Sequence, residues 1–209
     1  MEEFRTEQES FWAGDFGRDY IDRNREAALI ASNAALFARA LRGVGPIHSV
    51  VEFGANIGNN LKALQVLFPS ASQRGVEINQ DAASELGRVI GPENVVTGSI
   101  LDPLEGPPAD LVLSKGLLIH LDPSVLELAY TRIIEASSKF ILICEYYNPT
   151  PIGIPYRGHE NRLFKRDFAG EILDRQSDLE LRDYGFVYRR DKSFALDDIT
   201  WFLLARRGC

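Results

Sequence analysis

The chain has 209 residues, 45% of them hydrophobic, with a formal net charge of -7 and an isoelectric point near 5.1. This length and apolar content are sufficient for one domain with a packed core. The acidic balance argues against a nucleic-acid partner, because such proteins present a basic face to phosphates. No apolar run reaches the roughly eighteen residues of a membrane span, so we expect no membrane partner.

The first residues are charged and acidic, unlike a secretory signal peptide, and the chain has two cysteines, Cys144 and Cys209. Reduced cysteines are the default for a chain with so few of them. We therefore expect a cytoplasmic protein.

The sequence predicts mainly helix from the N-terminus to about Gly43. Apolar residues recur at helical spacing from Asp19 to Leu41, without proline. The aromatic, glycine-rich segment 11–17 before them is expected to be a folded-over lid or loop. We assign residues 1–45 to a helical lid and residues 46–209 to the ligand-binding domain, within one compact unit.

Strands and helices alternate from residue 48 onward. The predicted strands span 49–53, 73–77, 94–97, 110–113 and 139–145, and the predicted helices span 59–67, 80–90, 123–136 and 167–174. Two alternating segments, 179–188 and 198–205, are expected to form a closing antiparallel pair. This order predicts an α/β fold with a doubly wound, seven-stranded sheet and an antiparallel edge.

The most informative stretch, residues 50–61, reads as a buried strand, a tight turn at Gly54 and Gly58, and a helix N-terminus. The next predicted strand ends in an acid, Glu77. Turn glycines let the backbone approach a ligand, and an acid about twenty residues later accepts hydrogen bonds from ribose hydroxyls. The two features predict a nucleoside-bearing cofactor, with Ile78 packing on its base.

The identity of this cofactor depends on Asn56 and Glu52. Dinucleotide folds usually carry G-x-G-x-x-G, but here Asn56 takes the middle glycine's place and adds bulk where a pyrophosphate would lie. Glu52, two residues before the first glycine, suits a cationic ligand better than a diphosphate. The pattern resembles motif I of class I S-adenosylmethionine (SAM)-dependent methyltransferases, in which this acid lies near the methionine ammonium. An NAD(P)-dependent oxidoreductase of the same general fold is the alternative.

Ligands of such sheets bind outside the carboxyl ends of the strands, so residues that follow each strand are candidate contacts. Ser99 and Ile100 follow the third predicted strand. In the methyltransferase pattern an acid often holds the adenine amine at the position of Ser99, and Asp102 is a candidate substitute. Ser114 and Lys115 follow the fourth strand, where the backbone usually contacts the cofactor.

Four residues are candidates for catalysis. His120 follows the fourth strand and has a side chain suited to a general base near neutral pH, although a structural histidine bonded to backbone is the alternative. His159 lies in the polar segment 156–162, which we expect to be a substrate-contacting or merely solvated loop. Glu145 and Tyr146 end the fifth strand. The histidines show no metal-ligand spacing, so we expect no metal.

Tyr20, Arg23 and Asn24 share one helical face by their spacing. This face either reaches the carboxylate of SAM or consists of ordinary surface residues.

Four stretches together resemble the pseudaminic acid biosynthesis-associated methylases. They are Phe-Trp-x-Gly-x-Phe-Gly-x-x-Tyr-Ile-x-Arg-Asn over 11–24, Glu-Phe-Gly-Ala-Asn-Ile-Gly-x-Asn-Leu over 52–61, Ser-Lys-Gly with Ile-His-Leu over 114–121, and Glu-Tyr-Tyr-Asn-Pro over 145–149. The resemblance covers nearly the whole chain. It implies a class I SAM-dependent methyltransferase connected with sugar biosynthesis, and it favours Tyr20, Arg23 and Asn24 as site residues.

We therefore expect methyl transfer from SAM to an oxygen or nitrogen of a small polar metabolite, such as a nonulosonic-acid-type sugar or its nucleotide-activated form. Holding the acceptor in line with the methyl group would supply most of the acceleration. The alternatives are a non-catalytic SAM-binding or partner-binding module and the oxidoreductase named above. The sequence leaves open whether the chain forms a homodimer.

Overall fold

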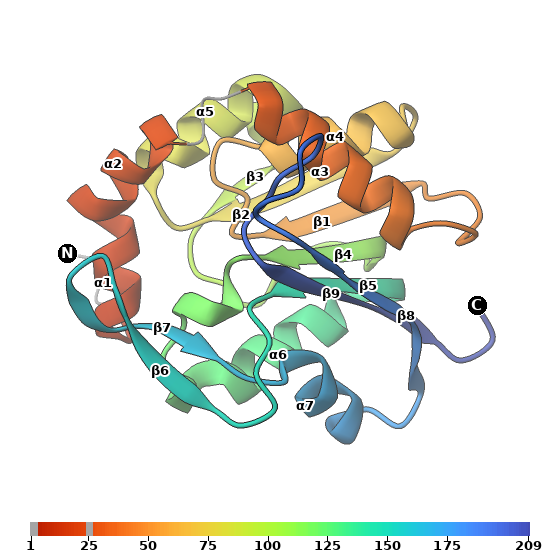
Figure 1. Ribbon diagram of the computed structural model, residues 1–209. Helices are drawn as coiled ribbons and strands as arrows, with labels where there is room; N and C mark the ends of the chain where they lie inside the picture. The colour runs from red at the N-terminus through yellow and green to blue at the C-terminus, as the bar shows by residue number, and fades with distance from the viewer. Residues whose placement is uncertain (1–3, 24–26) are drawn as a thin grey trace.

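The structure, a computed structural model, describes residues 4–23 and 27–209, and within them a seven-stranded sheet has the order β3-β2-β1-β4-β5-β9-β8 (Figure 1). The strands are β1 (Ser49–Phe53), β2 (Ser72–Glu77), β3 (Val95–Thr97), β4 (Ala109–Lys115), β5 (Ser137–Glu145), β8 (Leu179–Val187) and β9 (Ile199–Arg206). The first five run parallel, whereas β9 pairs antiparallel with β5 and β8. The predicted doubly wound sheet with an antiparallel edge is confirmed.

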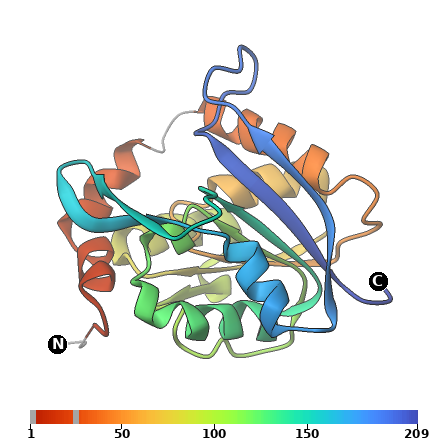
Figure 2. The same ribbon diagram turned by 60° about the horizontal axis from the view of Figure 1, so that its bottom comes forward.

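Helices cover both faces of this sheet (Figures 1 and 2). One layer holds α3 (Ala27–Ala40), α4 (Asn59–Leu67) and α5 (Gln80–Ile90), and the other holds α6 (Leu126–Glu135) and α7 (Phe168–Arg175). Three short 3-10 helices of the described chain are η1 (Pro92–Asn94), η2 (Leu118–His120) and η3 (Pro123–Val125). Since β1, β4 and β5 are buried on both faces, their runs are almost continuously apolar.

The N-terminal segment differs from the prediction. Helices α1 (Glu7–Ala13) and α2 (Asp15–Arg23) lie beside the carboxyl ends of the parallel strands (Figure 1), so the predicted loop over 11–17 is wrong. A reciprocal cap between Thr6 and Glu9 starts α1 before the aromatic residues are reached. The predicted single helix is instead α2 and α3 on either side of residues 24–26. Because α3 packs in a helical layer, we call α1 and α2 alone the N-terminal helix pair.

A second difference is the segment predicted as a loop around residues 156–162. It forms an antiparallel hairpin of β6 (Ile152–Tyr156) and β7 (His159–Lys165). The turn residues Arg157 and Gly158 have φ of 51° and 85°, the left-handed pair that a two-residue hairpin turn requires. Figure 2 shows this hairpin reaching across to the N-terminal helix pair.

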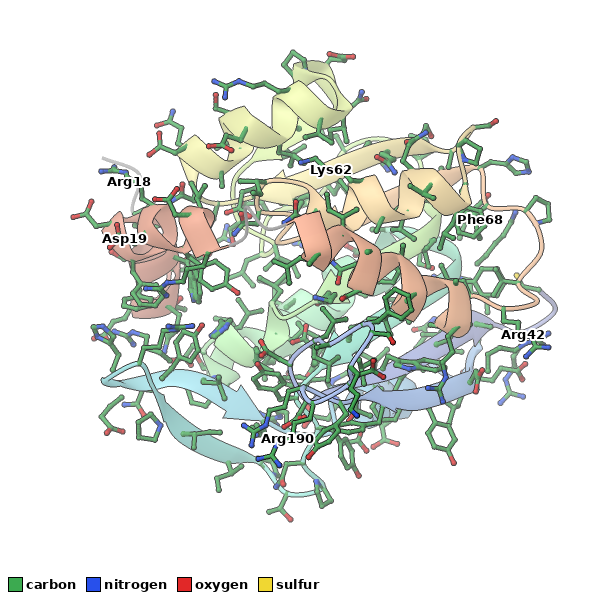
Figure 3. The ribbon with its side chains drawn as sticks, turned by 45° about the horizontal axis from the view of Figure 1, so that its top comes forward. Arg18, Asp19, Arg42, Lys62, Phe68 and Arg190 are labelled. Carbon is green, nitrogen blue, oxygen red and sulfur yellow. The ribbon has the colours of Figure 1, made fainter. Side chains whose placement is uncertain are left out.

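The loop between β8 and β9 passes next to α3, where Figure 3 labels Arg190. At the other side of the molecule, Figure 3 shows Arg18 and Asp19 projecting from α2. The Arg18 Nε donates to Asp81 at 2.8 Å and so connects α2 to the start of α5.

No helix of the described chain is both long and apolar enough to cross a bilayer.

Candidate active site

A cavity of about 200 Å³ opens at the carboxyl ends of the parallel strands, beneath the N-terminal helix pair. Eleven of the residues singled out from the sequence line it: Tyr20, Gly54, Asn56, Glu77, Ile78, Ser99, Ile100, Lys115, His120, Glu145 and Tyr146. Five others do not line it: Arg23, Glu52, Gly58, Ser114 and His159. Asn24 lies outside the described residues.

The turn after β1 forms one end of the cavity. Gly54, Asn56 and Gly58 have φ of 71°, 47° and 82°, so all lie in the left-handed region. The Asn56 Oδ1 accepts the N–H of Ile57 at 2.7 Å, which fixes this side chain against its own turn. Gly58 does not line the cavity, but packing excludes a side chain at this position. A Cβ there would lie 2.9 Å from Leu86 Cδ1.

Glu77 at the end of β2 presents a pre-arranged carboxylate to the cavity. Its Oε2 accepts the N–H of Asn56 at 2.7 Å, and its Oε1 accepts the N–H of Asn79 at 2.8 Å. Burial raises the pKa of this carboxyl group above its ordinary value, while the backbone donors oppose that shift. Glu77 lines the cavity at the position where the sequence predicts an acceptor for ribose hydroxyls.

Glu52 does not reach the cavity, contrary to the prediction of a direct ligand contact. It is fully buried in β1, where its Oε1 accepts from Asn60 Nδ2 at 2.6 Å. Asn60 lines the cavity, and so does the buried Asn33 of α3. The Glu52 Oε2, Asn60 Oδ1 and Asn33 Oδ1 atoms are buried without a hydrogen-bond partner among the described residues. Burial raises the pKa of Glu52 to about 8.

Glu145 holds a turn together, which contradicts its assignment as a free catalytic base. Its Oε1 accepts from Ser114 Oγ at 3.0 Å and from the N–H groups of Leu117 and Leu118 at 3.1 Å. Its Oε2 lies 3.5 Å from the Ile119 nitrogen. Burial raises the pKa of Glu145 to about 7. Ser114 is fully buried and does not line the cavity, so its hydroxyl supports the Glu145 carboxylate and the turn at 117–119 and does not contact a ligand.

His120 is a base-like side chain in the lining of the cavity. Its Nδ1 lies 2.7 Å from the carbonyl oxygen of Arg162. Since a carbonyl only accepts, Nδ1 carries the proton and Nε2 keeps its lone pair. The ring packs against Trp12 and Tyr156, with centroids at 4.6 and 4.9 Å. Burial lowers the pKa of His120 to about 4, so the ring is neutral near pH 7.

Tyr146 lines the cavity close to Asp197 of the β8–β9 loop. Burial, followed by the charge of Asp197 and the hydrogen bond to it, raises the pKa of this phenol above its ordinary value. Tyr146 is thus a neutral hydrogen-bonding group at neutral pH. Among the described residues, no group of three or more His, Cys, Asp or Glu side chains is arranged to hold a metal ion.

His159 and Arg23 lie on the outside of the N-terminal helix pair. His159 is exposed and packs on Phe11 and Phe16, with ring centroids 5.0 and 5.7 Å apart. The Arg23 guanidinium lies 5.6 Å from the centre of the Phe16 ring. Neither side chain borders the cavity, so the catalytic role predicted for His159 and the ligand contact predicted for Arg23 find no geometric support.

Asn79, which the sequence reasoning missed, fastens the helix pair to the sheet. Its Oδ1 caps α5, and its Nδ2 lies 3.2–3.3 Å from the carbonyl oxygens of Trp12, Ala13 and Gly14. Gly17 makes this approach possible, because a Cβ there would lie 1.9 Å from the Trp12 oxygen. The position of Asn79 just before a predicted helix indicates a cap. Its contacts with the carbonyl oxygens of α1 are not predictable from sequence, because they join residues 65–67 positions apart.

Comparison with known proteins places the chain by its fold alone. No protein-family model matches it, and no curated protein matches it significantly in sequence. Among solved structures, a 1,6-didemethyltoxoflavin-N1-methyltransferase from Burkholderia thailandensis with bound S-adenosylhomocysteine has a TM-score of 0.70 at 17% identity, over 99% of this chain and 93% of that one. The magnesium protoporphyrin IX methyltransferase of Synechocystis PCC 6803 with bound SAM has a TM-score of 0.65 at 12% identity, over 98% and 99%.

A third similar structure is the mitomycin 7-O-methyltransferase, with a TM-score of 0.69 at 15% identity. The match covers 96% of this chain but spans only 61% of that protein. The chain therefore has the Rossmann-like fold of SAM-dependent methyltransferases.

Gly17→Ala should detach the helix pair. Alanine normally stabilises a helix by up to about 1 kcal/mol relative to glycine, but here the new methyl group clashes with backbone and should destabilise by about 1–3 kcal/mol instead. We expect faster hydrogen exchange in residues 7–20. Gly153→Ala, whose Cβ meets only the Phe164 ring at 3.6 Å, is the matched control. Unchanged exchange in the Gly17 variant would contradict this docking.

The buried glutamates predict a pH dependence of stability. The unfolded chain releases these protons near the ordinary pKa of 4.5, whereas folded Glu52 and Glu145 hold theirs to about 8 and about 7. The free energy of unfolding should therefore fall as pH rises from about 4.5 to about 8.

Glu52→Gln should make this decline shallower, by at most about 1.4 kcal/mol per pH unit for one proton. Urea denaturation at pH 5, 6, 7 and 8 measures it. The exposed Glu180→Gln variant controls for the change of net charge. Parallel pH profiles for wild type and Glu52→Gln would show that Glu52 titrates alike in both states.

Proposed function

We propose that the chain is a SAM-dependent methyltransferase that acts on an oxygen or nitrogen of a small polar metabolite. The observation that carries the proposal is the Glu77 carboxylate, which two backbone N–H groups hold at the wall of a cavity beside a left-handed turn. This arrangement fits the two vicinal hydroxyls of a ribose. The fold shared with SAM-dependent methyltransferases supports the same assignment.

The remaining contacts of the cavity fit the two ends of SAM. Ile78 and Ile100 offer apolar surface for a base next to Glu77. Asn33 and Asn60 also line the cavity, and their unpartnered oxygens fit a donor such as the ammonium of an amino acid. A cation at this position would also favour ionisation of Glu52 behind Asn60. Bound SAM supplies an electrophilic methyl carbon on a sulfonium.

His120 is suited to remove the proton from the acceptor. The Arg162 carbonyl fixes the tautomer in which Nε2 is free to accept, and burial keeps the ring unprotonated. Trp12 and Tyr156 pack on this ring and limit access of water. Positioning of the acceptor between His120 and the methionine end supplies the main acceleration. Glu145 keeps the turn that precedes His120 in place.

Several aromatic rings and polar side chains line the cavity. They are Trp12, Tyr20, Tyr146 and Tyr156, together with Lys115 and Asp197. Aromatic faces flanked by charged and hydroxyl groups suit a polar ring. We therefore keep a nonulosonic-acid-type sugar or its nucleotide-activated form as the first acceptor class to test, on the strength of the sequence resemblance. The division into a lid of residues 1–45 and a SAM-binding domain of residues 46–209 is likewise a proposal.

Two other functions make different predictions. An NAD(P)-dependent oxidoreductase needs a diphosphate beside the glycine turn, where the Asn56 side chain lies. A non-catalytic SAM-binding or partner-binding module would bind the cofactor without turnover and would not depend on His120. Calorimetry with S-adenosylhomocysteine and with NAD separates the first, and a search for turnover with acceptor panels separates the second.

Glu77→Ala should weaken S-adenosylhomocysteine binding roughly 10- to 150-fold, because charge-assisted hydrogen bonds to the ribose are lost. Isothermal titration measures this, with NAD as the ligand that should not bind. Circular dichroism verifies that the variant is folded at the titration temperature. Equal affinity of wild type and variant would remove Glu77 from the site.

His120→Asn should lower kcat about 10²- to 10⁴-fold while S-adenosylhomocysteine affinity stays unchanged. The asparagine amide can still donate to the Arg162 carbonyl in place of Nδ1 but offers nothing at the position of Nε2. The measurement is S-adenosylhomocysteine formation with an acceptor that the wild type methylates. Full activity in this variant would assign the proton transfer to another group or to none.

A further inference from the structure

The position after β3 lacks the acid that would bind an adenine amine, and its side chain is already engaged. Ser99 donates its hydroxyl proton to Glu9 Oε1, and its Oγ accepts the N–H of Leu101 at 3.0 Å. Asp102, the substitute expected from the sequence, accepts from Arg5 Nη2 at 2.6 Å and does not line the cavity. The loop therefore offers no carboxylate to a ligand amine, because Ser99 has none and Asp102 lies outside the cavity lining.

Ser99 nevertheless marks where the base of a bound nucleoside would lie. Glu77 pairs with Thr97 across β2 and β3, so Ile78 and the segment Gly98-Ser99 leave their strands at the same carboxyl end of the sheet. A ribose held by Glu77 would direct its base into the space between them, where Ile78, Ser99 and Ile100 all line the cavity.

Helix α1 brings a carboxylate to this place. Glu9 is only 6% exposed, lines the cavity and contacts Ser99 through Oε1. Its Oε2 accepts the N–H groups of Arg5 at 2.6 Å and Thr6 at 3.3 Å, so the carboxylate is fixed in the helix cap. A serine Oγ corresponds to the Cγ of an aspartate, and the Glu9 oxygen therefore stands close to where an aspartate at 99 would place its own.

Gln8, the neighbour of Glu9 on α1, gives an independent indication of a ligand in the cavity. Its side chain is 4% exposed, lines the cavity, and donates from Nε2 to the Asn161 carbonyl at 3.0 Å. That bond fixes the amide orientation, and the opposite atom, Oε1, is buried without a partner among the described residues. A buried carbonyl oxygen without a donor is costly, so a ligand N–H at this position would be favoured.

We propose that helix α1 recognises the 6-amino group of the adenine, with Glu9 as its principal acceptor and Gln8 Oε1 as the second. The proposal rests on the proposed function. The amino group offers two N–H donors, and the helix offers two fixed oxygens. In this arrangement helix α1, and not the loop after β3, binds the adenine. The same helix also carries Trp12, which packs on His120.

The test compares two ligands by isothermal titration: S-adenosylhomocysteine and S-inosylhomocysteine, which has an oxygen in place of the 6-amino group. Wild type should prefer the adenosine form by at least about tenfold, because the carboxylate repels the oxygen. In Glu9→Gln the amide oxygen can still accept the N–H groups of the helix cap, while the amide nitrogen faces the ligand as a donor. The preference for S-adenosylhomocysteine over S-inosylhomocysteine should therefore fall about tenfold or reverse. Glu7→Gln, on an exposed neighbour with the same charge, should leave the preference unchanged.

A rescue variant separates recognition from support of the helix. Glu9→Ala should lose the preference, and Glu9→Ala combined with Ser99→Asp should restore it, since the aspartate puts the acid back on the sheet edge. If Glu9→Gln binds both ligands with an unchanged ratio, Glu9 serves the helix cap alone and the inference is overturned. If wild type binds neither ligand, the proposed function itself fails.

Discussion

A carboxylate buried away from water is costly unless fixed hydrogen bonds replace its hydration, and this constraint organises the whole site. Glu77 ends β2 and Glu145 ends β5, with β1 and β4 between them. Each carboxylate accepts N–H groups from a turn at the carboxyl end of the adjacent strand, and Glu77 also accepts from the turn after its own strand. The turn residues must point their N–H groups at the Glu77 and Glu145 oxygens, which restricts the conformation of these turns. Because Asn56, Asn79 and Leu117 of the turns line the cavity, the same hydrogen bonds determine its shape.

The second part of the site comes from segments that are remote in sequence. The N-terminal helix pair, the β6–β7 hairpin and the β8–β9 loop all meet the cavity opposite the sheet. The hairpin has a double role, since the Arg162 carbonyl orients His120 and the neighbouring Asn161 carbonyl binds Gln8. Motion of the hairpin would thus alter the histidine and the helix together. Binding of cofactor and orientation of the base are connected through one strand.

The strands of the sheet could be predicted from the sequence, because the spacing of apolar residues and the composition of a segment are local properties. The apolar run before Glu145, the glycine turn after β1 and the acid at 77 each imply a conformation without knowledge of any partner. The hairpin was missed although Arg157-Gly158 forms a two-residue turn, because polar strands outside the core lack a clear alternation of apolar residues. Glu9 was missed for a different reason. Thr6 and Glu9 mark a helix start, but only the folded chain brings that carboxylate to Ser99.

The remoteness of the partners of α1 has a consequence for the order of folding. Gln8 and Glu7 make their contacts with residues 153 and 155 positions later in the chain. Closing so long a loop costs entropy that only an already formed sheet and hairpin can offset. We therefore expect α1, which precedes the sheet in the chain, to dock after the sheet and the hairpin have formed. Because Gln8, Glu9 and Trp12 of α1 line the cavity, its wall would be complete only once this helix has docked.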